Sequence, residues 1–198
     1  MKATSNKLMA VDLDNTYVQG NTLHLYIKEG LKRAKLPQKV AIAAFLALRR
    51  MRLISHQTMK FGCIRNINAD DTILHSNFTS KIHTLINPTV LKLINEFDGT
   101  VIIASAAPDI YIPWIWERDF LATASTNNLT KSELRGEAKA KAVTEYAHKN
   151  NLIIDTVITD HSDDIPMMQL PGARVFLINP TAKTLSKLPV IQNLTILQ

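Results

Sequence analysis

The sequence predicts an α/β protein, in which a doubly wound parallel sheet carries an inserted block of helices. Short apolar runs typical of buried strands stand at 8–11, 100–104, 152–159 and 174–178. Helical patterns separate these runs, and strands that alternate with helices favour a parallel sheet. The stretch from Tyr17 to Asn87 shows no strand pattern, so we expect it to be helical.

The helical block begins soon after the first strand. Its candidate helices occupy 24–34, 38–53, 55–67 and 70–86. Pro37 separates the first two, and Ser55 is a typical N-cap for the third. Helices inserted after the first strand can lie over the strand ends as a cap that excludes water and selects the substrate. We therefore expect residues 18–86 to form a cap and residues 1–17 and 87–198 to form the core.

The second half of the chain alternates between helices and strands. Pro88 opens a helix over 89–97, which stops at the turn dipeptide Asp98-Gly99. The later elements are expected as a strand at 100–104, a helix from 105–109 through 118, a short strand at 120–123, a turn at 127–128, a helix at 137–150, a strand at 152–159, a short helix at 165–170, a strand at 174–178 and a short helix at 181–188 before an apolar tail. This order suits a sheet with helices on both faces.

Three of the predicted strands end in polar side chains. These are Asp12 and Asp14 after the first strand, Ser105 after the strand at 100–104, and Asp160, Asp163 and Asp164 after the strand at 152–159. Because the carboxyl ends of parallel strands share one edge of a sheet, we expect these groups to converge there. Two carboxylates one residue apart repel each other unless a cation or a shared proton intervenes. We interpret Asp12 as a nucleophile, Asp14 as its acid/base partner and Mg²⁺ as that cation.

Length and composition suit a globular protein with one core and a small insert. The chain has 198 residues, of which 46% are hydrophobic and 20% charged. Its single cysteine, Cys63, excludes an internal disulfide and fits a reducing compartment. The polar N-terminus is unlike a signal peptide, and the longest apolar run, 40–48, is far shorter than the roughly 20 residues of a membrane span. We expect a cytoplasmic protein.

The formal charge of +6 favours an anionic partner. Basic residues concentrate at 28–52 and 131–149, where they mix with aliphatic residues. They lack the aromatic and glycine pattern of an RNA-binding surface. We therefore expect no nucleic-acid partner. We expect the substrate to be a small phosphorylated compound, because attraction of an anionic substrate would explain the positive charge equally well.

Taken in order, the motifs resemble those of the haloacid dehalogenase superfamily. They are Asp12-x-Asp14-x-Thr16, a serine that closes a strand, Gly136-Glu137-x-Lys139, and Asp160-x-x-x-Asp164-x-Pro166. Together they cover nearly the whole chain. Within the superfamily the chain resembles the phosphoserine phosphatase-like branch, whose helical cap lies between the first two motifs. The resemblance implies a Rossmann-like core, phosphatase activity and Mg²⁺ as cofactor.

The resemblance also implies roles for the four aspartates. Asp12 attacks phosphorus and forms an aspartyl-phosphate. Asp14 binds Mg²⁺ through its backbone carbonyl, while its side chain protonates the leaving oxygen and later takes a proton from water. These roles require Asp12 to be ionised and Asp14 to be protonated at the start, so their pKa values must be pushed apart. Asp160 is a Mg²⁺ ligand, and Asp164 is either a ligand or a carboxylate that orients one.

The phosphate is expected to meet a second group of residues. The Ser105 hydroxyl donates to a phosphate oxygen, helped by the amide of Ala106 at the predicted start of the next helix. A plain helix cap is the alternative role for Ser105. Asn15 suits the tight turn of the first motif and joins this group. Lys139 neutralises the phosphoryl group and the nucleophile, with Lys141 as the competing choice.

The cap departs from the phosphoserine phosphatase pattern. Those enzymes have a cap glutamate that holds the ammonium group of the substrate, and the matching position here is Asn21. Arg65 matches their carboxylate-binding arginine only loosely. Asp163 stands where they commonly carry Asn, which adds a negative charge to the metal loop. We therefore expect a substrate other than phosphoserine.

Hydrolysis of a phosphomonoester is the expected activity, and three alternatives stay open. One is phosphotransfer from the same aspartyl-phosphate. Another is a lipid-phosphate phosphatase, held on an anionic membrane by the basic, apolar helix at 40–52. The third is a non-catalytic phosphate-binding protein, whose expected signature is the loss of an acid, whereas all four motif aspartates are present. A dehalogenase is disfavoured, because that chemistry needs no metal and dispenses with the second aspartate.

Overall fold

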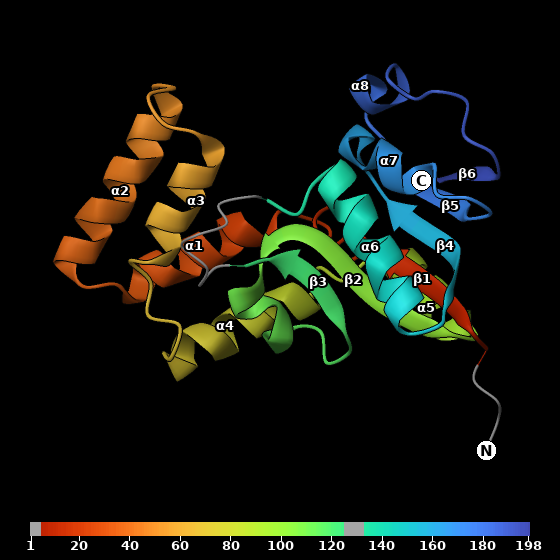
Figure 1. Cartoon of the computed structure of the whole chain (residues 1–198). Coiled ribbons are helices and arrows are strands. Elements are labelled where there is room, and N and C mark those ends of the chain that lie inside the picture. Colours follow the sequence, from red (N-terminus) through yellow and green to blue (C-terminus); the bar gives the residue numbers. More distant parts are fainter. Residues whose placement is uncertain (1–4, 125–132) are drawn as a thin grey trace.

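A six-stranded parallel sheet forms the centre of the protein (Figure 1). The computed structural model describes residues 5–124 and 133–198. The strands are β1 (Lys7–Val11), β2 (Thr100–Pro108), β3 (Phe120–Thr123), β4 (Ile153–Thr159), β5 (Arg174–Ile178) and β6 (Leu194–Leu197), arranged in the order β3-β2-β1-β4-β5-β6. The chain moves outward from β1 in both directions, which is the predicted doubly wound arrangement. The loops that follow β1, β2 and β4 therefore open side by side at one edge.

Helices cover both faces of this sheet. Helix α5 (Pro88–Glu96) packs on one face, and α6 (Glu137–Lys149) packs on the other. The side chains of β1 alternate between these layers, with Met9 and Val11 on the α5 side and Leu8 and Ala10 on the α6 side. A strand that is apolar on both faces explains the unbroken apolar run at 8–11. The shorter helical elements are η1 (Asp109–Trp114), η2 (Ser162–Asp164), α7 (Ile165–Met168) and α8 (Ala182–Leu185).

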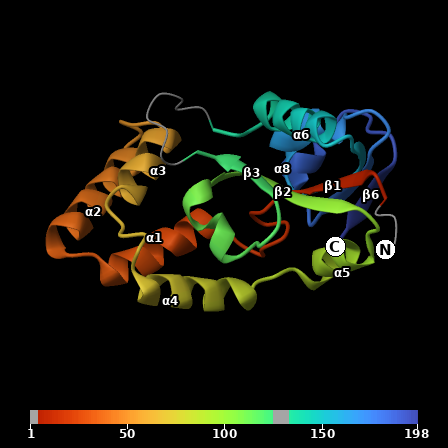
Figure 2. The same ribbon diagram turned by 60° about the horizontal axis from the view of Figure 1, so that its bottom comes forward.

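Four helices between β1 and β2 form a lobe beside the sheet. They are α1 (Thr22–Arg33), α2 (Leu36–Arg50), α3 (His56–Ile64) and α4 (Thr72–His83). Figure 2 shows α2 and α3 farthest from the sheet, while α4 runs from the lobe toward α5. Side chains of Asn21, Ser55 and Asp71 accept hydrogen bonds from amides in the first turns of α1, α3 and α4. These N-caps explain where the three helices begin.

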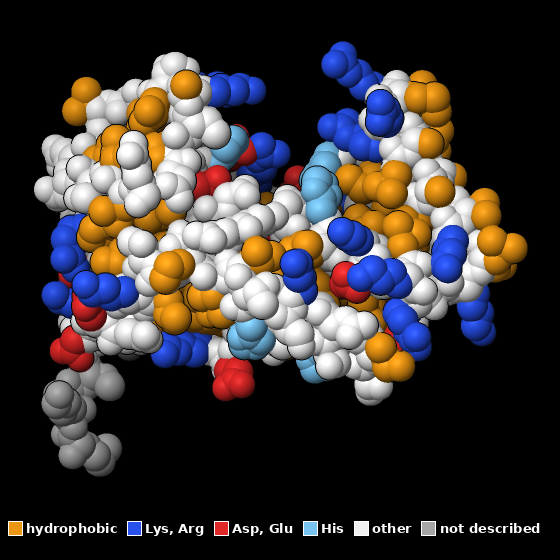
Figure 3. Space-filling model, turned by 180° about the vertical axis from the view of Figure 1, so that it is seen from behind, with side chains coloured by type: hydrophobic (Ala, Val, Ile, Leu, Met, Phe, Trp, Pro, Cys, Tyr) orange, Lys and Arg blue, Asp and Glu red, His pale blue; other side chains and the backbone are white. Residues whose placement is uncertain are grey.

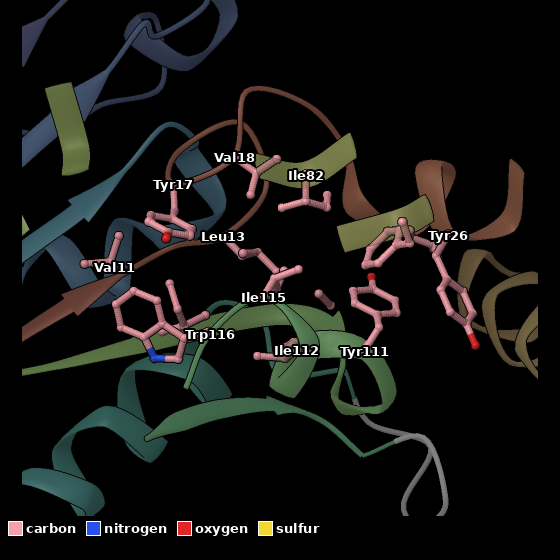
Figure 4. Packing of buried hydrophobic residues seen from close by; sticks show 14 of the residues in the cluster. Val11, Leu13, Tyr17, Val18, Tyr26, Ile82, Tyr111, Ile112, Ile115 and Trp116 are labelled. Carbon is pink, nitrogen blue, oxygen red and sulfur yellow. The ribbon is translucent and has the colours of Figure 1, made fainter. Parts of the chain in front are cut away.

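The helical lobe and the sheet share one hydrophobic cluster. Tyr26 of α1 stacks near Tyr111 of η1, with ring centroids 4.9 Å apart, and Phe78 of α4 contacts both rings. Trp116 packs edge-on to Tyr17, directly behind the first motif. Figure 4 shows Leu13, Tyr17 and Trp116 continuing the layer that begins at Val11. The lobe is thus held against the sheet by buried aromatic area, a strong stabilising contact.

Two expectations about the secondary structure were wrong. The helix predicted from 105–109 through 118 is absent: β2 continues to Pro108, which pairs with Thr123, and only the 3-10 helix η1 follows. Proline disfavours the helical conformation at the residue before it, so the chain stays extended through Ala107. The apolar tail forms the edge strand β6, which we did not predict.

Other differences concern helix ends and the undescribed segment. Helix α2 stops at Arg50 instead of residue 53, because Arg52 adopts a left-handed conformation with φ of 60°. The turn expected at 127–128 lies outside the described residues. In the part of the chain that the structure describes, no helix combines the length and the apolar character needed to cross a membrane.

Candidate active site

A pocket of about 270 Å³ lies where the loops after β1, β2 and β4 meet the helical lobe. Figure 3 shows the molecule hollowed between its two lobes, with charged and histidine side chains at the opening. The residues that line it include every aspartate of the predicted site. From the sheet side the lining includes Asp12, Asp14, Asn15, Ser105, Ala106, Ala107, Glu133, Leu134, Arg135, Lys139, Asp160, His161, Asp163 and Asp164, and from the helical lobe Asn21, Leu23, His56 and Lys60. The sequence prediction that these distant motifs converge agrees with this arrangement.

Asp12 lies at the bottom of the pocket, one residue beyond β1. Its backbone amide donates to the carbonyl of Ile158 in β4 at 2.8 Å, which fixes the start of the loop. Lys139 donates to its Oδ1 at 2.6 Å, and the side chain is largely buried. Burial raises the pKa of Asp12 to about 8, since Lys139 only partly offsets the loss of solvent and the carboxylate of Asp164 adds to the rise.

Lys139 joins two of the motif aspartates. It projects from the first turn of α6, is 3% exposed, and donates to Asp12 Oδ1 at 2.6 Å and to Asp164 Oδ2 at 2.7 Å. Thr159 donates to the same Asp164 oxygen at 2.7 Å. Burial opposes the charge of Lys139, but the two carboxylates outweigh it and raise its pKa. The competing candidate, Lys141, lies on the surface 3.8 Å from Glu145.

Asp14 is held by the first residue of the helical lobe. Its Oδ1 accepts from both the amide and the hydroxyl of Thr22, each at 2.7 Å, and the Thr22 hydroxyl lies 3.1 Å from the Tyr111 hydroxyl. Burial raises the pKa of Asp14, although the hydrogen bonds from Thr22 oppose the rise. Both of these hydrogen bonds use Oδ1 of Asp14.

Asn15 and Gly20 shape the loop that carries these two aspartates. Asn15 has a φ of 56° and donates from its amide to the carbonyl of Gly20 at 3.1 Å. Asn tolerates this left-handed conformation better than most residues, which suits Asn15 to the tight turn expected of the first motif. The closed loop brings Thr22 back to Asp14.

The donor set at the rim fits a Mg²⁺ ion. Asp12 and Asp160 follow neighbouring strands, and Thr16 donates to Asp160 Oδ1 at 3.4 Å. Burial raises the pKa of Asp160 to about 6. Among the described residues no three His, Cys, Asp or Glu side chains form a ready-made metal cluster. Mg²⁺ needs fewer, because it commonly binds one or two carboxylates and keeps several waters.

The pocket also has an excess of negative charge. Five aspartates and Glu133 line it, against the three cations Lys60, Arg135 and Lys139. Burial raises the pKa values of Asp12, Asp14 and Asp160. A bound divalent cation would relieve this repulsion and favour the ionised carboxylates. Asp164 has one oxygen already engaged, because its Oδ2 accepts from both Lys139 and Thr159.

Ser105 and Ala106 both line the pocket, but the helix expected to begin after Ser105 is absent. Ser105 is 2% exposed and lies in β2, where its Oγ accepts from the amide of Ala107 at 3.1 Å, so its hydroxyl proton is left for an acceptor in the pocket. Ala106 is also in the strand, and no helix begins there to concentrate amide dipoles. Its carbonyl accepts from Lys60 at 2.8 Å and from Thr123 at 2.9 Å.

Comparison with known proteins identifies the family. A family model described as haloacid dehalogenase-like hydrolase matches residues 10–169, which include all four motifs. The chain belongs to this family. A search of curated proteins found no match. The family match and the parallel sheet both support a haloacid dehalogenase-like fold.

Several solved structures share this fold. A protein of unknown function from Bordetella pertussis Tohama I matches with a TM-score of 0.72 at 12% identity, over 92% of this chain and 94% of that one. A HAD family hydrolase from Salmonella enterica serovar Typhi has a TM-score of 0.64 at 15% identity, over 96% and 68%. A probable phosphoserine phosphatase from Vibrio cholerae has a TM-score of 0.64 at 14% identity, over 96% of this chain and 60% of its own length.

The haloacid dehalogenase-like site contains a buried lysine that sequence reasoning missed. Lys60 of α3 is 3% exposed and forms an ion pair with Glu133 at 2.5 Å, in addition to its hydrogen bond with the Ala106 carbonyl. His56 lies 3.4 Å from the same carboxylate. The hydrogen bond with His56, together with Lys60, lowers the pKa of Glu133 to about 2 despite its burial. These contacts join the helical lobe to the sheet at the pocket wall.

Of the two cap residues compared with the phosphoserine phosphatase pattern, Asn21 lines the pocket and Arg65 does not. Asn21 lines the pocket, but its Oδ1 accepts from the amide of His24 at 2.9 Å and caps α1. Arg65 is the exposed C-cap of α3. Lys60, five residues earlier in α3, is one of the cations that line the pocket. Local sequence gave no sign of this, because its partner Glu133 is distant in the chain.

Replacing Lys60 with Met should destabilise the protein by about 1–3 kcal/mol, because the Ala106 carbonyl and the half-buried Glu133 lose a buried donor. Urea denaturation of the full chain measures the change in the free energy of unfolding. The matched control is Lys92→Met on the surface of α5, where the partner Glu96 is 3.9 Å away, and its effect should stay within about 0.5 kcal/mol. Equal effects of the two substitutions would contradict the assigned contact.

Proposed function

We propose that this haloacid dehalogenase-like hydrolase is a Mg²⁺-dependent phosphatase, which hydrolyses small phosphomonoesters through an aspartyl-phosphate on Asp12. The observation that carries the proposal is the position of Lys139 between Asp12 and Asp164, at the bottom of a pocket that Asp14, Ser105 and Asp160 also line. One space is thereby surrounded by a nucleophile (Asp12), a proton carrier (Asp14), a cation (Lys139) and a hydroxyl donor (Ser105). Its size suits a phosphoryl group and a small leaving group.

The first half of the proposed reaction transfers the phosphoryl group to the protein. Asp12 attacks phosphorus with a carboxylate oxygen while the bond from phosphorus to the leaving oxygen breaks. Asp14 gives its proton to that leaving oxygen, consistent with a pKa that burial raises. Lys139 and Ser105 offset the charge on the phosphoryl oxygens.

The second half returns the protein to its starting state. Asp14, now ionised, takes a proton from water as the water attacks phosphorus, and the bond between phosphorus and Asp12 breaks. Inorganic phosphate leaves, and Asp14 is again protonated. Mg²⁺, held by Asp12, Asp160 and the Asp14 carbonyl, would supply charge neutralisation between a dianionic phosphate and a carboxylate. In this arrangement Asp164 positions Lys139, because its Oδ2 is already engaged.

The pocket wall favours a leaving group without an ammonium charge. Asn21 uses its carbonyl oxygen to cap α1, and the charge of Glu133 is balanced by Lys60. We propose a small phosphorylated substrate other than phosphoserine. A panel of phosphorylated metabolites, assayed for phosphate release, would identify it.

Removal of divalent ions with EDTA should abolish hydrolysis of para-nitrophenyl phosphate, and added Mg²⁺ should restore it. Because burial raises the pKa of Asp12 to about 8 in the metal-free protein, Mg²⁺ binding near neutral pH should also release protons. The apparent affinity for Mg²⁺ should therefore increase as the pH rises toward that value. Calorimetry in two buffers of different ionisation enthalpy measures the proton release. Full turnover without metal, or binding without proton release, would count against the proposal.

A further inference from the structure

The outward face of α2 is apolar and exposed. Leu36 is 75% exposed and Val40 is 61% exposed, and Ala43 and Ala47 continue the same face at helical spacing. The opposite face packs on α3, where the ring of Phe45 lies so close to Gly62 that an added Cβ would be only 2.5 Å from it. The apolar outer face is thus a second face of the helix, separate from the one that stabilises the lobe.

More exposed apolar side chains follow the helix. Met51 is 59% exposed and Leu53 is 68% exposed, immediately after the last turn of α2. We call the exposed apolar set Leu36, Val40, Ala43, Ala47, Met51 and Leu53 the α2 outer face. A contiguous exposed patch of apolar side chains marks a site that contacts a membrane or a protein partner.

The same region carries the excess of positive over negative charge in the protein. Residues 30–69 contain nine Lys or Arg residues and no Asp or Glu, whereas the rest of the chain has 14 basic and 17 acidic residues. The net charge of +6 therefore arises entirely from this segment. A concentration of one sign of charge beside exposed apolar side chains indicates a partner that is both anionic and apolar.

Much of this charge faces solvent around the α2 outer face. Lys32 and Arg33 have acidic partners in Glu29 and Asp71. For Lys35, Lys39, Arg50 and Arg52, the structure records no ion pair within the described ranges, and all four are exposed. Figure 3 shows orange and blue side chains interspersed over the right-hand part of that view, where the helical lobe lies. This surface has the composition of an interfacial helix, with Leu and Met between Lys and Arg.

We propose that the α2 outer face docks the protein onto an anionic lipid membrane. The apolar side chains enter the boundary between headgroups and acyl chains, while Lys39, Arg50 and Arg52 face the headgroup phosphates. A second copy of the chain is a poorer occupant, because a symmetric interface would bring these positive charges together. An RNA surface would need exposed aromatic side chains for base stacking, and α2 has only Phe45, which packs inward.

Co-sedimentation with vesicles tests this proposal without reference to the phosphatase. The full chain should bind vesicles of phosphatidylcholine mixed with phosphatidylserine, bind phosphatidylcholine alone far more weakly, and lose affinity as salt is added. The triple variant Lys39→Glu, Arg50→Glu, Arg52→Glu should bind the anionic vesicles at least about 100-fold more weakly, at roughly fivefold for each charge removed. Leu36→Ser with Val40→Ser should weaken binding as well, with the basic residues intact.

The matched control changes the same charge elsewhere. Lys149→Glu, Lys183→Glu and Lys187→Glu replace three exposed lysines of α6 and the α8 region, so the net charge falls equally while α2 is untouched. This variant should bind nearly as well as the natural chain. Circular dichroism measures whether each variant is folded. If the triple α2 variant does not fold, the test uses Arg50→Gln in its place, together with the salt dependence of binding by the natural chain.

Three results would overturn the proposal. They are equal binding to neutral and anionic vesicles, equal loss in the α2 and control variants, and no binding to anionic vesicles at all. Sedimentation equilibrium adds a fourth: a dimer that the α2 substitutions disrupt, in a chain that does not bind vesicles, would assign this face to self-association.

Discussion

Asp12→Asn is expected to reduce kcat for para-nitrophenyl phosphate by at least about 10³-fold, because the amide cannot attack phosphorus. The substitution is nearly isosteric, and its carbonyl oxygen can still accept the hydrogen bond that Lys139 donates to Oδ1 at 2.6 Å. It also removes one carboxylate from a crowded acidic pocket. We therefore expect the fold to be retained and thermal unfolding to change little, so the loss of activity is specific.

The control for this substitution is Asp70→Asn, an exposed acid just before α4. It should leave kcat within a few-fold of the natural chain, since surface changes of this kind are usually near neutral. Activity retained in Asp12→Asn would remove the assigned nucleophile. Loss of activity together with loss of the far-ultraviolet circular dichroism signal would instead point to a structural role.

Lys139→Met should have the second-largest effect, on activity and stability together. Removal of the cation should lower kcat by about 10²–10³-fold, as loss of a preorganised charge in an active site does. It also leaves Asp12 and Asp164, both buried, without their shared partner. Breaking a buried ion pair by deleting one member costs about 3–5 kcal/mol of unfolding free energy.

The stability loss in Lys139→Met should depend on pH. Burial already raises the pKa of Asp12 in the folded state, and Lys139 opposes that rise, so loss of the lysine should raise the Asp12 pKa further above that of the unfolded chain. A raised pKa in the folded state means that stability is fully present below the unfolded pKa and is lost as the pH rises through the folded one. The deficit relative to the natural chain should therefore grow from acidic toward neutral pH, and urea denaturation across that range measures it.

Lys141→Met is the matched control, two residues along the same helix. Lys141 is exposed and lies 3.8 Å from Glu145, so its loss should change unfolding by no more than about 0.5 kcal/mol. Its activity should be that of the natural chain. The opposite pattern, with Lys141 needed and Lys139 dispensable, would reassign the phosphate lysine.

The sequence was sufficient to predict the strands that carry the site. Residues 8–11 are apolar at every position because β1 is buried on both faces, so the position of Asp12 and Asp14 at a strand exit could be inferred locally. The spacing from Gly136 to Lys139 placed the lysine in the first turn of α6, where the structure has it. Convergence of the motifs followed from parallel strands sharing one edge.

Contacts between distant residues could not be predicted in the same way. Lys60 looks like an ordinary helix lysine until the fold brings Glu133 to it. The length of β2 was also misjudged, because Ser105 and Pro108 resemble a helix start, whereas pairing with β3 keeps them extended. Asn21 was noted only as the residue at the position of the cap glutamate, and sequence alone did not indicate that its side-chain oxygen caps α1.

A crystal structure of the protein with Mg²⁺ and beryllofluoride tests the central claim most directly. Beryllofluoride is a stable mimic of a phosphoryl group attached to a carboxylate. The proposal predicts that it is bonded to a side-chain oxygen of Asp12, with Mg²⁺ bound by Asp12, Asp160 and the Asp14 carbonyl, and with Lys139 and Ser105 contacting the fluorides. Beryllofluoride bonded to another residue, or Mg²⁺ bound away from Asp12, would contradict it.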